Sequence, residues 1–195
     1  MYEAFRKSYL VSHFVFKNYV DLTTDEAIEV LKCRNDIAVR KWMTSTEEIP
    51  LENHLKFIEG LKSSEKNFYW AVYQDDKFQG GISLTGMDDF RANSGIFLNP
   101  KLIGNGLGMQ ISICSVDFYF LYQNMKSIYS VVQKDNFNAI KLNKFLGCTF
   151  YENEGDFIPI DLKRDVWLGK RSKMLKMALG KNVEKVEIKP VSFVL

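Results

Sequence analysis

The stretch from Asn99 to Cys114 reads NPKLIGNGLGMQISIC and holds three of the chain's 12 glycines within five residues. A glycine inside a helix or strand costs roughly 0.5–1 kcal/mol relative to alanine. Gly104, Gly106 and Gly108 therefore indicate a place where the backbone must lack side chains. An apolar run follows directly, which predicts that the glycine loop opens a buried helix over about Gly108–Gln123.

Glycine-rich loops that open a helix usually bind phosphate, because backbone N–H groups and the helix dipole both favour an anion. A P-loop is excluded, because no Lys-Ser/Thr pair follows the glycines. A dinucleotide-binding loop is excluded as well, because the spacing is Gly-x-Gly-x-Gly and no acid lies between Asp117 and Asp135. A plain tight turn remains an alternative to phosphate binding.

Length and composition indicate one globular domain: the chain has 195 residues, of which 46% are apolar and 26% charged. The net charge of +2 argues neither for nor against a polyanionic partner. Cys33, Cys114 and Cys148 lack metal-ligand spacing, so we expect reduced thiols in a cytoplasmic protein without a metal. The charged N-terminus and the absence of an apolar run of about 18 residues predict neither a signal peptide nor a membrane span.

Local signals predict helices and strands on both sides of the loop. Thr23 or Thr24 can cap a helix that runs to about Cys33, because acids occupy its first turn. Aromatic-rich segments joined by Asp75-Asp76-Lys77 are typical of a hairpin. The expected strands are His13–Val20, Asn67–Gln74, Phe78–Thr85, Ser94–Asn99, Ser127–Gln133, Cys148–Tyr151 and about Ile158–Leu168, with a loop at Gly86–Asn93.

Two further helices are expected. One begins with Pro50 as its first residue, and the other covers Asn136–Phe145 and ends at Gly147. The predicted core-facing residues of the first are Leu51, Leu55, Ile58 and Leu61.

The composition changes after Lys170, which we take as the end of the main domain, residues 1–170. Lys163 to Lys189 holds nine Lys/Arg and three Asp/Glu. Residues 171–195 could be a solvated basic tail, or an element that packs on the domain or forms a dimer. Within it, a short helix at Ser172–Leu179 and a strand-like Val183–Leu195 are expected.

The antiparallel strand, the glycine loop and the buried helix together resemble the pyrophosphate loop of the GCN5-related N-acetyltransferases (GNAT). In that family the loop cradles the pyrophosphate of acetyl coenzyme A. The family pattern is Arg/Gln-x-x-Gly-x-Gly/Ala. Gly106 and Gly108 match it, whereas Ile103 stands where the Arg or Gln belongs.

A second block, NFNAIKLNKFLGCTF at 136–150, resembles the family's Asn-x-x-Ala-x-x-Leu-Tyr-x-Lys-x-Gly-Phe segment. One helix and one strand separate it from the loop, as in the family. The resemblance implies that Asn136 bonds the pantetheine arm. Asn143 occupies the position of the tyrosine that usually protonates the departing thiolate, and an asparagine can donate a hydrogen bond but no proton at neutral pH.

The resemblance implies an α/β (α+β) GNAT fold: a mixed, mostly antiparallel central sheet, splayed at the acetyl-coenzyme A site and flanked by helices. It implies that the backbone N–H near Leu98 polarises the thioester carbonyl. Asn143, at the position of the family tyrosine, and Ser83, on the strand before that of Leu98, are the other candidate catalytic residues. The implied cofactor-binding residues are Phe97, Leu98, Ile103, Gly104, Asn105, Gly106, Leu107, Gly108, Met109, Asn136, Asn143 and Lys144.

The N-terminal third must supply the acceptor site, because both cofactor blocks lie later. It resembles the branch that acetylates the 4-amino group of UDP-linked 4-amino-4,6-dideoxy sugars in pseudaminic acid synthesis for flagellin and related glycans. The residues that carry this resemblance are Arg34-Asn35, Trp42-Met43 and a histidine, His54, that opens a helix containing Phe57. The implied partner is a small nucleotide sugar rather than nucleic acid or a membrane, and a homodimer could form.

Each acceptor residue also has a structural interpretation: Arg34 could end a helix, His54 could be half-exposed, and Trp42 and Met43 could be core. In the functional interpretation, the Arg34 guanidinium pairs with phosphate, whose geometry its planar fork fits. His54 could then bond a phosphate or the uridine.

The remaining acceptor contacts are apolar or neutral. Trp42, Met43 and Phe57 would bury the apolar face of the sugar. Ser83 and Thr85, alternate residues of one strand, could bond the sugar or a water that takes the amine proton.

Direct attack of a neutral amine on the thioester is the expected reaction, because no cysteine occupies a plausible nucleophile position. Two other functions stay open. One is acetylation of protein N-termini, as in enzymes that act on ribosomal proteins. The other is a non-catalytic acetyl-coenzyme A binding module.

Overall fold

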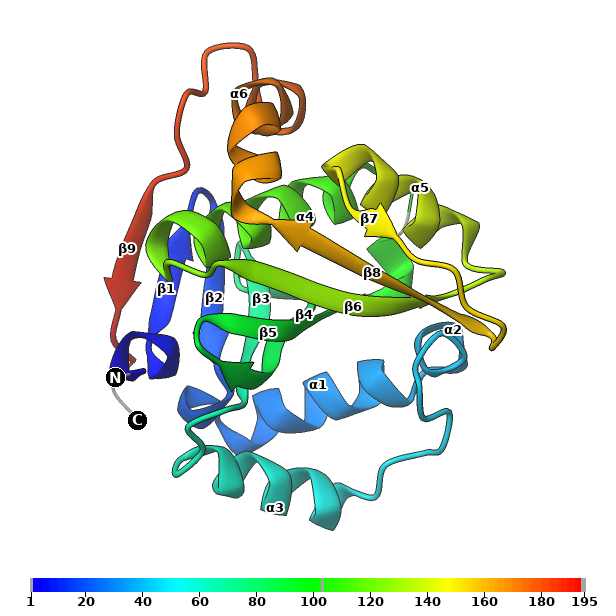
Figure 1. Cartoon of the computed structure of the whole chain (residues 1–195). Helices are drawn as coiled ribbons and strands as arrows, with labels where there is room; N and C mark the ends of the chain where they lie inside the picture. The colour runs from blue at the N-terminus through cyan, green and yellow to red at the C-terminus, as the bar shows by residue number, and fades with distance from the viewer. Residues whose placement is uncertain (1, 103, 194–195) are drawn as a thin grey trace.

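A computed structural model describes residues 2–102 and 104–193. Its central sheet has the strand order β7-β8-β6-β5-β4-β3-β2-β1-β9 (Figure 1). Every neighbouring pair is antiparallel except β5 and β6, which are parallel. The strands are β1 (Ser8–Val11), β2 (Phe14–Asn18), β3 (Phe68–Gln74), β4 (Lys77–Asp88), β5 (Arg91–Leu98), β6 (Ser127–Gln133), β7 (Thr149–Phe150), β8 (Phe157–Lys163) and β9 (Ile188–Val191).

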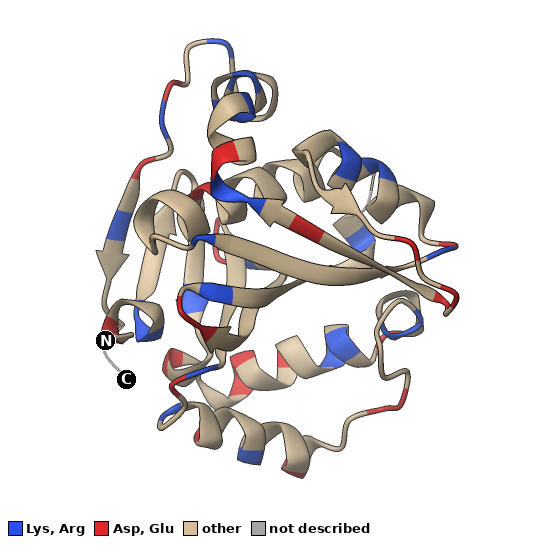
Figure 2. Ribbon diagram, in the orientation of Figure 1, with Lys and Arg blue, Asp and Glu red and all other residues tan. Residues whose placement is uncertain are grey.

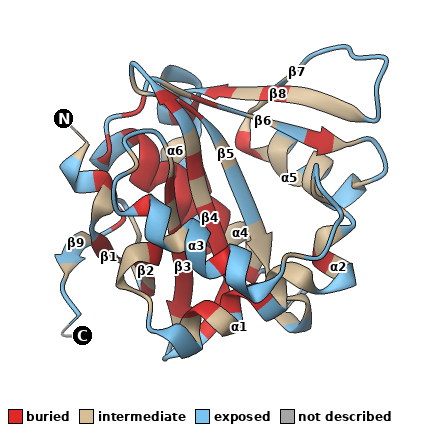
Figure 3. Ribbon diagram, turned by 90° about the horizontal axis from the view of Figure 1, so that it is seen from below, coloured by how far each residue is buried: buried red, intermediate tan, exposed pale blue. Residues whose placement is uncertain are grey.

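Helices cover both faces of this sheet. The helices α1 and α3 lie on one face, seen from below in Figure 3, and α4, α5 and α6 lie on the other (Figure 1). This mixed sheet with flanking helices confirms the predicted fold class. The helices are α1 (Thr24–Asn35), α2 (Ile37–Arg40), α3 (Leu51–Leu61), α4 (Leu107–Asp117), α5 (Phe137–Leu146) and α6 (Arg164–Leu179).

Several turns and helix ends with strong local sequence signals lie where they were predicted. The Thr23 hydroxyl accepts from the Glu26 N–H, and the Glu26 carboxylate accepts from the Thr23 N–H, so a capping box begins α1. The hairpin turn between β3 and β4 uses Asp75 and Asp76 at φ 50° and 57°. Gly147, at φ 101°, ends α5 as its left-handed cap.

Two sequence predictions are wrong around the sheet. The expected loop Gly86–Asn93 is strand for most of its length, because a register shift between Thr85 and Asp88 absorbs the extra residues. The turn itself consists of Asp89 and Phe90, both at positive φ. The last long strand ends at Lys163 rather than near Leu168, because α6 begins at Arg164.

Two helices also differ from their predictions. In α3, Leu61 is buried and Ile58 packs against the core, as predicted. Leu51 and Leu55 are 43% and 36% exposed instead, because His54 takes the buried position in the first half of the helix. The buried helix after the glycine loop ends at Asp117. It continues as one π-helical turn, Phe118–Tyr122, rather than as α-helix to Gln123.

The segment after Lys170 packs on the same core as the rest of the chain. Lys170 itself lies inside α6, which buries Trp167, Met174 and Leu175. Farther on, β9 pairs with β1 at the edge of the sheet. In Figure 2, the Lys and Arg residues of α6 and of the segment that leads to β9 are interspersed with acidic residues. Within the described ranges, no helix is long and apolar enough to cross a membrane.

Candidate active site

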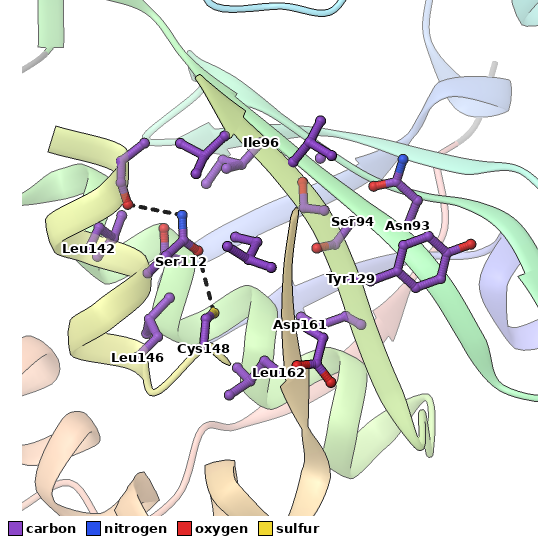
Figure 4. Close-up of a pocket in the computed structure, with 18 of the residues that line it drawn as sticks. Asn93, Ser94, Ile96, Ser112, Tyr129, Leu142, Leu146, Cys148, Asp161 and Leu162 are labelled. Carbon is purple, nitrogen blue, oxygen red and sulfur yellow. Dashed lines mark hydrogen bonds between the residues drawn. The ribbon is translucent and has the colours of Figure 1, made fainter. Parts of the chain in front are cut away.

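The sheet opens between β5 and β6. These strands pair only at one end, where Arg91–Asn93 face Ser127–Tyr129, and they diverge beyond it. A cavity of about 300 Å³ occupies the opening (Figure 4). It is lined by residues of β5 and β6, by one face each of α4 and α5, by β8 and by the loop after α2.

The cavity reaches both faces of the sheet. Side chains alternate along β6, and Ile128 and Val132 are buried while Tyr129 and Val131 are exposed, yet all four line the cavity. The loop after α2 closes one side, and the Gln133 side-chain amide holds it by donating to the Lys41 carbonyl at 2.8 Å. Two ligands can therefore approach the same space from opposite faces.

The three glycines of the loop before α4 differ in their backbone conformation and surroundings. Gly104 and Gly106 lie at φ 103° and 82°, and a Cβ on either would project into open space. Gly108 instead lies against β5: its Cβ would lie 2.7 Å from a Leu98 methyl, so the Leu98 side chain would have to move. The predicted contribution of Ile103 lies outside the described residues.

Asparagine side chains just before α4 and at the start of α5 accept hydrogen bonds from the backbone. The Asn105 side-chain oxygen accepts from the Leu107 N–H at 3.1 Å. The Asn136 side-chain oxygen accepts from the Ala139 N–H at 3.1 Å, so Asn136 caps α5 at the cavity rim. Met109, from the first turn of α4, packs against the core.

Asn143 projects from α5 into the cavity and is held at both ends of its amide. Its Nδ2 donates to the Ala139 carbonyl at 2.9 Å, and its Oδ1 accepts from the Cys148 thiol at 3.6 Å (Figure 4). Lys144, the next residue, is exposed and does not line the cavity; its ammonium lies 5.5 Å from the Phe150 ring centre.

Cys148 is a residue that the sequence interpretation missed. Burial, and to a lesser extent the Asp161 carboxylate, raise the pKa of its thiol to about 12, so the thiol stays protonated and can donate. A signal was present in the sequence: the Gly147 cap turns the chain, and the Cys148 N–H donates to the Asn143 carbonyl at 3.0 Å. That turn brings the thiol next to the Asn143 side chain.

The predicted acceptor residues divide into two groups. Trp42 and Met43 line the cavity. Arg34, His54 and Phe57 instead lie on α1 and α3, on one face of the sheet.

Two tyrosines that the sequence interpretation missed, Tyr19 and Tyr69, complete an aromatic cluster on this face. The Phe57 and Tyr69 rings meet edge to face with their centroids 5.0 Å apart, and the Tyr19 and Tyr69 ring centroids are 5.5 Å apart. His54 stacks on Phe57 with a centroid distance of 6.4 Å.

Buried polar groups of this cluster lack partners within the described part of the chain. They are Nη1 of Arg34 and Nε2 of His54. Burial lowers the pKa of the Arg34 guanidinium, and Tyr19 and Cys33 partly oppose that shift. Unpaired buried polar groups are rare in folded proteins, so this cluster has the character of a binding site for a polar ligand.

The strand β4 lies between the aromatic cluster and the cavity and carries the predicted residues Ser83 and Thr85. Ser83 lies opposite Tyr69 of β3 and Gly95 of β5, and Gly95 lines the cavity. Thr85 follows two residues later and therefore points to the same face as Ser83.

The predicted cofactor residues Phe97 and Leu98, at the end of β5, point to opposite faces. The Phe97 ring covers Gly81 on the side of α1, and Leu98 packs toward α4.

His54 predicts a pH dependence of stability. Burial lowers its pKa below 6.5, although the Ala27 backbone partly opposes the shift. Below about pH 6.5, His54 therefore binds a proton in the unfolded chain more readily than in the folded chain. The free energy of unfolding falls as the pH falls. We expect the melting temperature of a His54→Phe variant to fall less than that of the native chain between pH 7.5 and 5.5. The exposed His13→Phe variant is the control, and an unchanged pH slope for His54→Phe would contradict the prediction.

The open sheet, the glycine loop and the two-sided cavity define the class of the protein as an acyltransferase that uses an activated thioester. The family model "Acetyltransferase (GNAT) domain" matches residues 19–149. The chain therefore belongs to the GNAT acetyltransferase family, and it is an N-acetyltransferase with acetyl coenzyme A as co-substrate.

Individual relatives support the same assignment. The chain is 30% identical over 148 residues to acetyltransferase PseH of Campylobacter jejuni strain 81-176, covering 76% of this chain and 92% of that protein. The crystal structure of C. jejuni PseH with acetyl coenzyme A has a TM-score of 0.62 at 24% identity, covering 77% of this chain and 98% of that one. Spermidine N-acetyltransferase from Vibrio cholerae, with CoA and spermine, has a TM-score of 0.71 at 13% identity, covering 80% and 98%, which shows a shared fold.

Proposed function

We propose that this N-acetyltransferase acetylates the 4-amino group of a UDP-linked 4-amino-4,6-dideoxy sugar, a reaction of pseudaminic-acid-type glycan synthesis. The similarity to PseH over most of both chains supports this acceptor. The observation that supports it most is the aromatic cluster beside the cavity, in which Arg34 and His54 each have a buried nitrogen atom without a partner among the described residues.

Arg34 is suited to the diphosphate of such an acceptor. Its guanidinium is half-buried beside Tyr19 and Tyr69, and no acidic side chain pairs with it in the described part of the chain. A bound phosphate would supply the missing acceptor atoms, and a charge-assisted bond of this kind is worth about 1.5–3 kcal/mol. His54 is held neutral by its lowered pKa, so it offers a neutral hydrogen bond rather than a second charge.

Apolar residues complete the acceptor site. Trp42 and Met43 line the cavity from the loop after α2, and Phe57 lies in the aromatic cluster. A 6-deoxy sugar carries a methyl group next to its reacting amine, and these side chains would remove that methyl from water. The loop of Trp42 is held to β6 through Lys41 and Gln133, so the wall is fixed before the acceptor binds.

Direct transfer from the thioester to the amine follows from the state of the cysteines. Burial raises the pKa of the Cys33 and Cys148 thiols to about 12, so neither is a thiolate at neutral pH. When acetyl coenzyme A is bound, it supplies the activated acetyl group. Ser83 would accept a hydrogen bond from the amine or from a water, and the free N–H of Asn143 would donate to the sulfur as negative charge develops there.

Arg34→Met tests the acceptor assignment. Coenzyme A release is measured with a panel of UDP- and dTDP-linked 4-amino sugars, and we expect turnover with a UDP-linked 4-amino-4,6-dideoxy sugar. In Arg34→Met, the KM for the nucleotide sugar should rise about 10- to 100-fold while the KM for acetyl coenzyme A stays unchanged. Arg164→Met, on α6, is the control.

Other outcomes of this assay point to the alternatives. An unchanged acceptor KM in Arg34→Met would restore the interpretation of Arg34 as a helix-end residue. Turnover of N-terminal peptides but no nucleotide sugar, together with no binding of UDP, would support a protein N-terminal acetyltransferase. Binding of acetyl coenzyme A without thiol release with any amine would support a non-catalytic module.

Asn143→Ala tests the role of the residue that replaces the tyrosine of the family pattern. We expect kcat to fall about 3- to 10-fold with little change in either KM, because one neutral hydrogen bond to the leaving sulfur is lost. The kcat of Asn143→Asp, a variant of the same size, should fall further, because its negative charge would repel the departing thiolate. Loss of all activity in Asn143→Ala without loss of folding would show that Asn143 does more than donate one bond.

A further inference from the structure

The cavity has an open end and a closed end. Both α4 and α5 connect parallel strands, so each helix runs antiparallel to β6. The glycine loop, Gln133 and Asn136 therefore lie at the open end. Tyr119, Ile128 and Leu146 lie at the closed end, where the sheet is still paired.

Space continues beyond Asn143 toward the closed end. Leu146 lines the cavity about one helical turn farther along α5 than Asn143. Along α4 and the π-helical turn that follows it, the lining extends from Ser112 to Tyr119, which is roughly 10 Å at 1.5 Å per residue. An acetyl group places only a methyl beyond its carbonyl, so the cavity is deeper than acetyl requires.

One polar group in the cavity wall lacks a partner within the described part of the chain. Ser112 is 5% exposed and lines the cavity (Figure 4), and its hydroxyl has no hydrogen-bond partner within the described residues. Ser115, one turn farther along the same helix, instead donates to the Ile111 carbonyl at 2.7 Å. The surrounding wall is otherwise mostly apolar, with Ile82, Ile128 and Leu162 among its members. An apolar pocket with one unpaired hydroxyl fits an apolar ligand that carries one polar group.

We propose that the cavity from Asn143 to its closed end is an acyl pocket, and that it accepts short acyl chains of three or four carbons that carry a hydroxyl group near the thioester, where Ser112 binds it. The proposal rests on the proposed function, because it takes the thioester to lie beside Asn143. The transfer is the same as for acetyl: the amine nitrogen bonds to the acyl carbon, the carbon–sulfur bond breaks, and the proton lost by the amine ends on the sulfur.

Binding measurements without any acceptor test the pocket. Calorimetry on the purified chain compares acetyl-, butanoyl- and 3-hydroxybutanoyl-coenzyme A. We expect 3-hydroxybutanoyl-coenzyme A to bind at least as tightly as acetyl-coenzyme A and about 3- to 10-fold more tightly than butanoyl-coenzyme A. In Ser112→Ala this preference for the hydroxyl should disappear while acetyl-coenzyme A still binds. Ser115→Ala, a matched change on the same helix, should keep the preference.

The native chain alone can overturn the proposal, even if a variant fails to fold. Butanoyl- and 3-hydroxybutanoyl-coenzyme A both binding more than tenfold more weakly than acetyl-coenzyme A would show that the pocket takes only acetyl, and the proposed function would stand. Equal affinity for the two four-carbon chains would overturn the role of Ser112. If acetyl-coenzyme A itself does not bind, the proposed function fails, and this proposal fails with it.

Discussion

The Arg171→Met variant is expected to unfold with a free energy about 3–5 kcal/mol lower than that of the native chain, because it would leave a buried carboxylate unpaired. Asp117, at the end of α4, is 1% exposed. The Arg171 guanidinium of α6 meets it in two bonds, Nε to Oδ1 at 2.6 Å and Nη2 to Oδ2 at 2.9 Å. Trp167 donates a third bond to Oδ1 at 3.0 Å.

Urea unfolding followed by circular dichroism measures the loss. The double variant Asp117→Asn/Arg171→Met should recover most of it, since a neutral amide is far less costly to bury than a carboxylate and can still accept from Trp167. Lys173→Met, an exposed cation on the same helix, is the matched control and should change stability by less than about 0.5 kcal/mol. A loss below about 1 kcal/mol in Arg171→Met would show that the pair behaves as an exposed ion pair.

The same ion pair explains why the C-terminal part of the fold was difficult to predict. The run of lysine and arginine after Lys163 is typical of a solvated segment, and a sequence does not show which single cation turns inward. Arg171 points into the core because it pairs there with the buried carboxylate of Asp117, which lies 54 positions earlier in the chain. The strand β9 lies within the segment Val183–Leu195 that was expected to be strand-like, but its pairing could not be predicted, since its partner β1 lies at the other end of the chain.

Elements with local signals were predictable. The Thr23–Glu26 capping box, the Asp75-Asp76 turn and the Gly147 cap each depend on residues within one turn of one another. The phase of α3 was not predictable in this way. Its apolar residues are spread around the helix, and the buried position falls to His54, which packs against the aromatic residues of the same face.

The candidate site also combines residues that local motifs predict with residues that only the folded chain brings together. The glycine loop and the block that contains Asn143 are contiguous motifs, so their positions could be read from the sequence. Tyr19, Tyr69 and Ser112 come from three separate elements that only the folded sheet assembles. A sequence also does not reveal which buried hydroxyl or guanidinium lacks a partner, because that depends on every neighbouring group.

Gly106→Val is expected to weaken acetyl-coenzyme A binding by at least 100-fold. Gly106 lies at φ 82° as the N-terminal cap of α4, and its missing side chain leaves open space in front of the loop. In the proposed function this space holds the pyrophosphate against the backbone N–H groups, so a branched Cβ would occupy the position of the anion. Valine also disfavours a positive φ, by roughly 1–2 kcal/mol, so part of the effect would be a change in loop conformation.

Two further variants separate these causes. Gly106→Asn tolerates the left-handed conformation yet still places a side chain before the loop, so it should keep the native melting temperature and lose binding. Gly180→Val, at φ 122° after α6 and outside the cavity lining, imposes a backbone strain at least as large and should keep binding. The measurement is the dissociation constant by calorimetry together with the melting temperature with and without ligand. If Gly106→Asn and Gly106→Val both fold and bind like the native chain, the glycines before α4 serve a tight turn alone, and the anion must bind elsewhere along the open sheet.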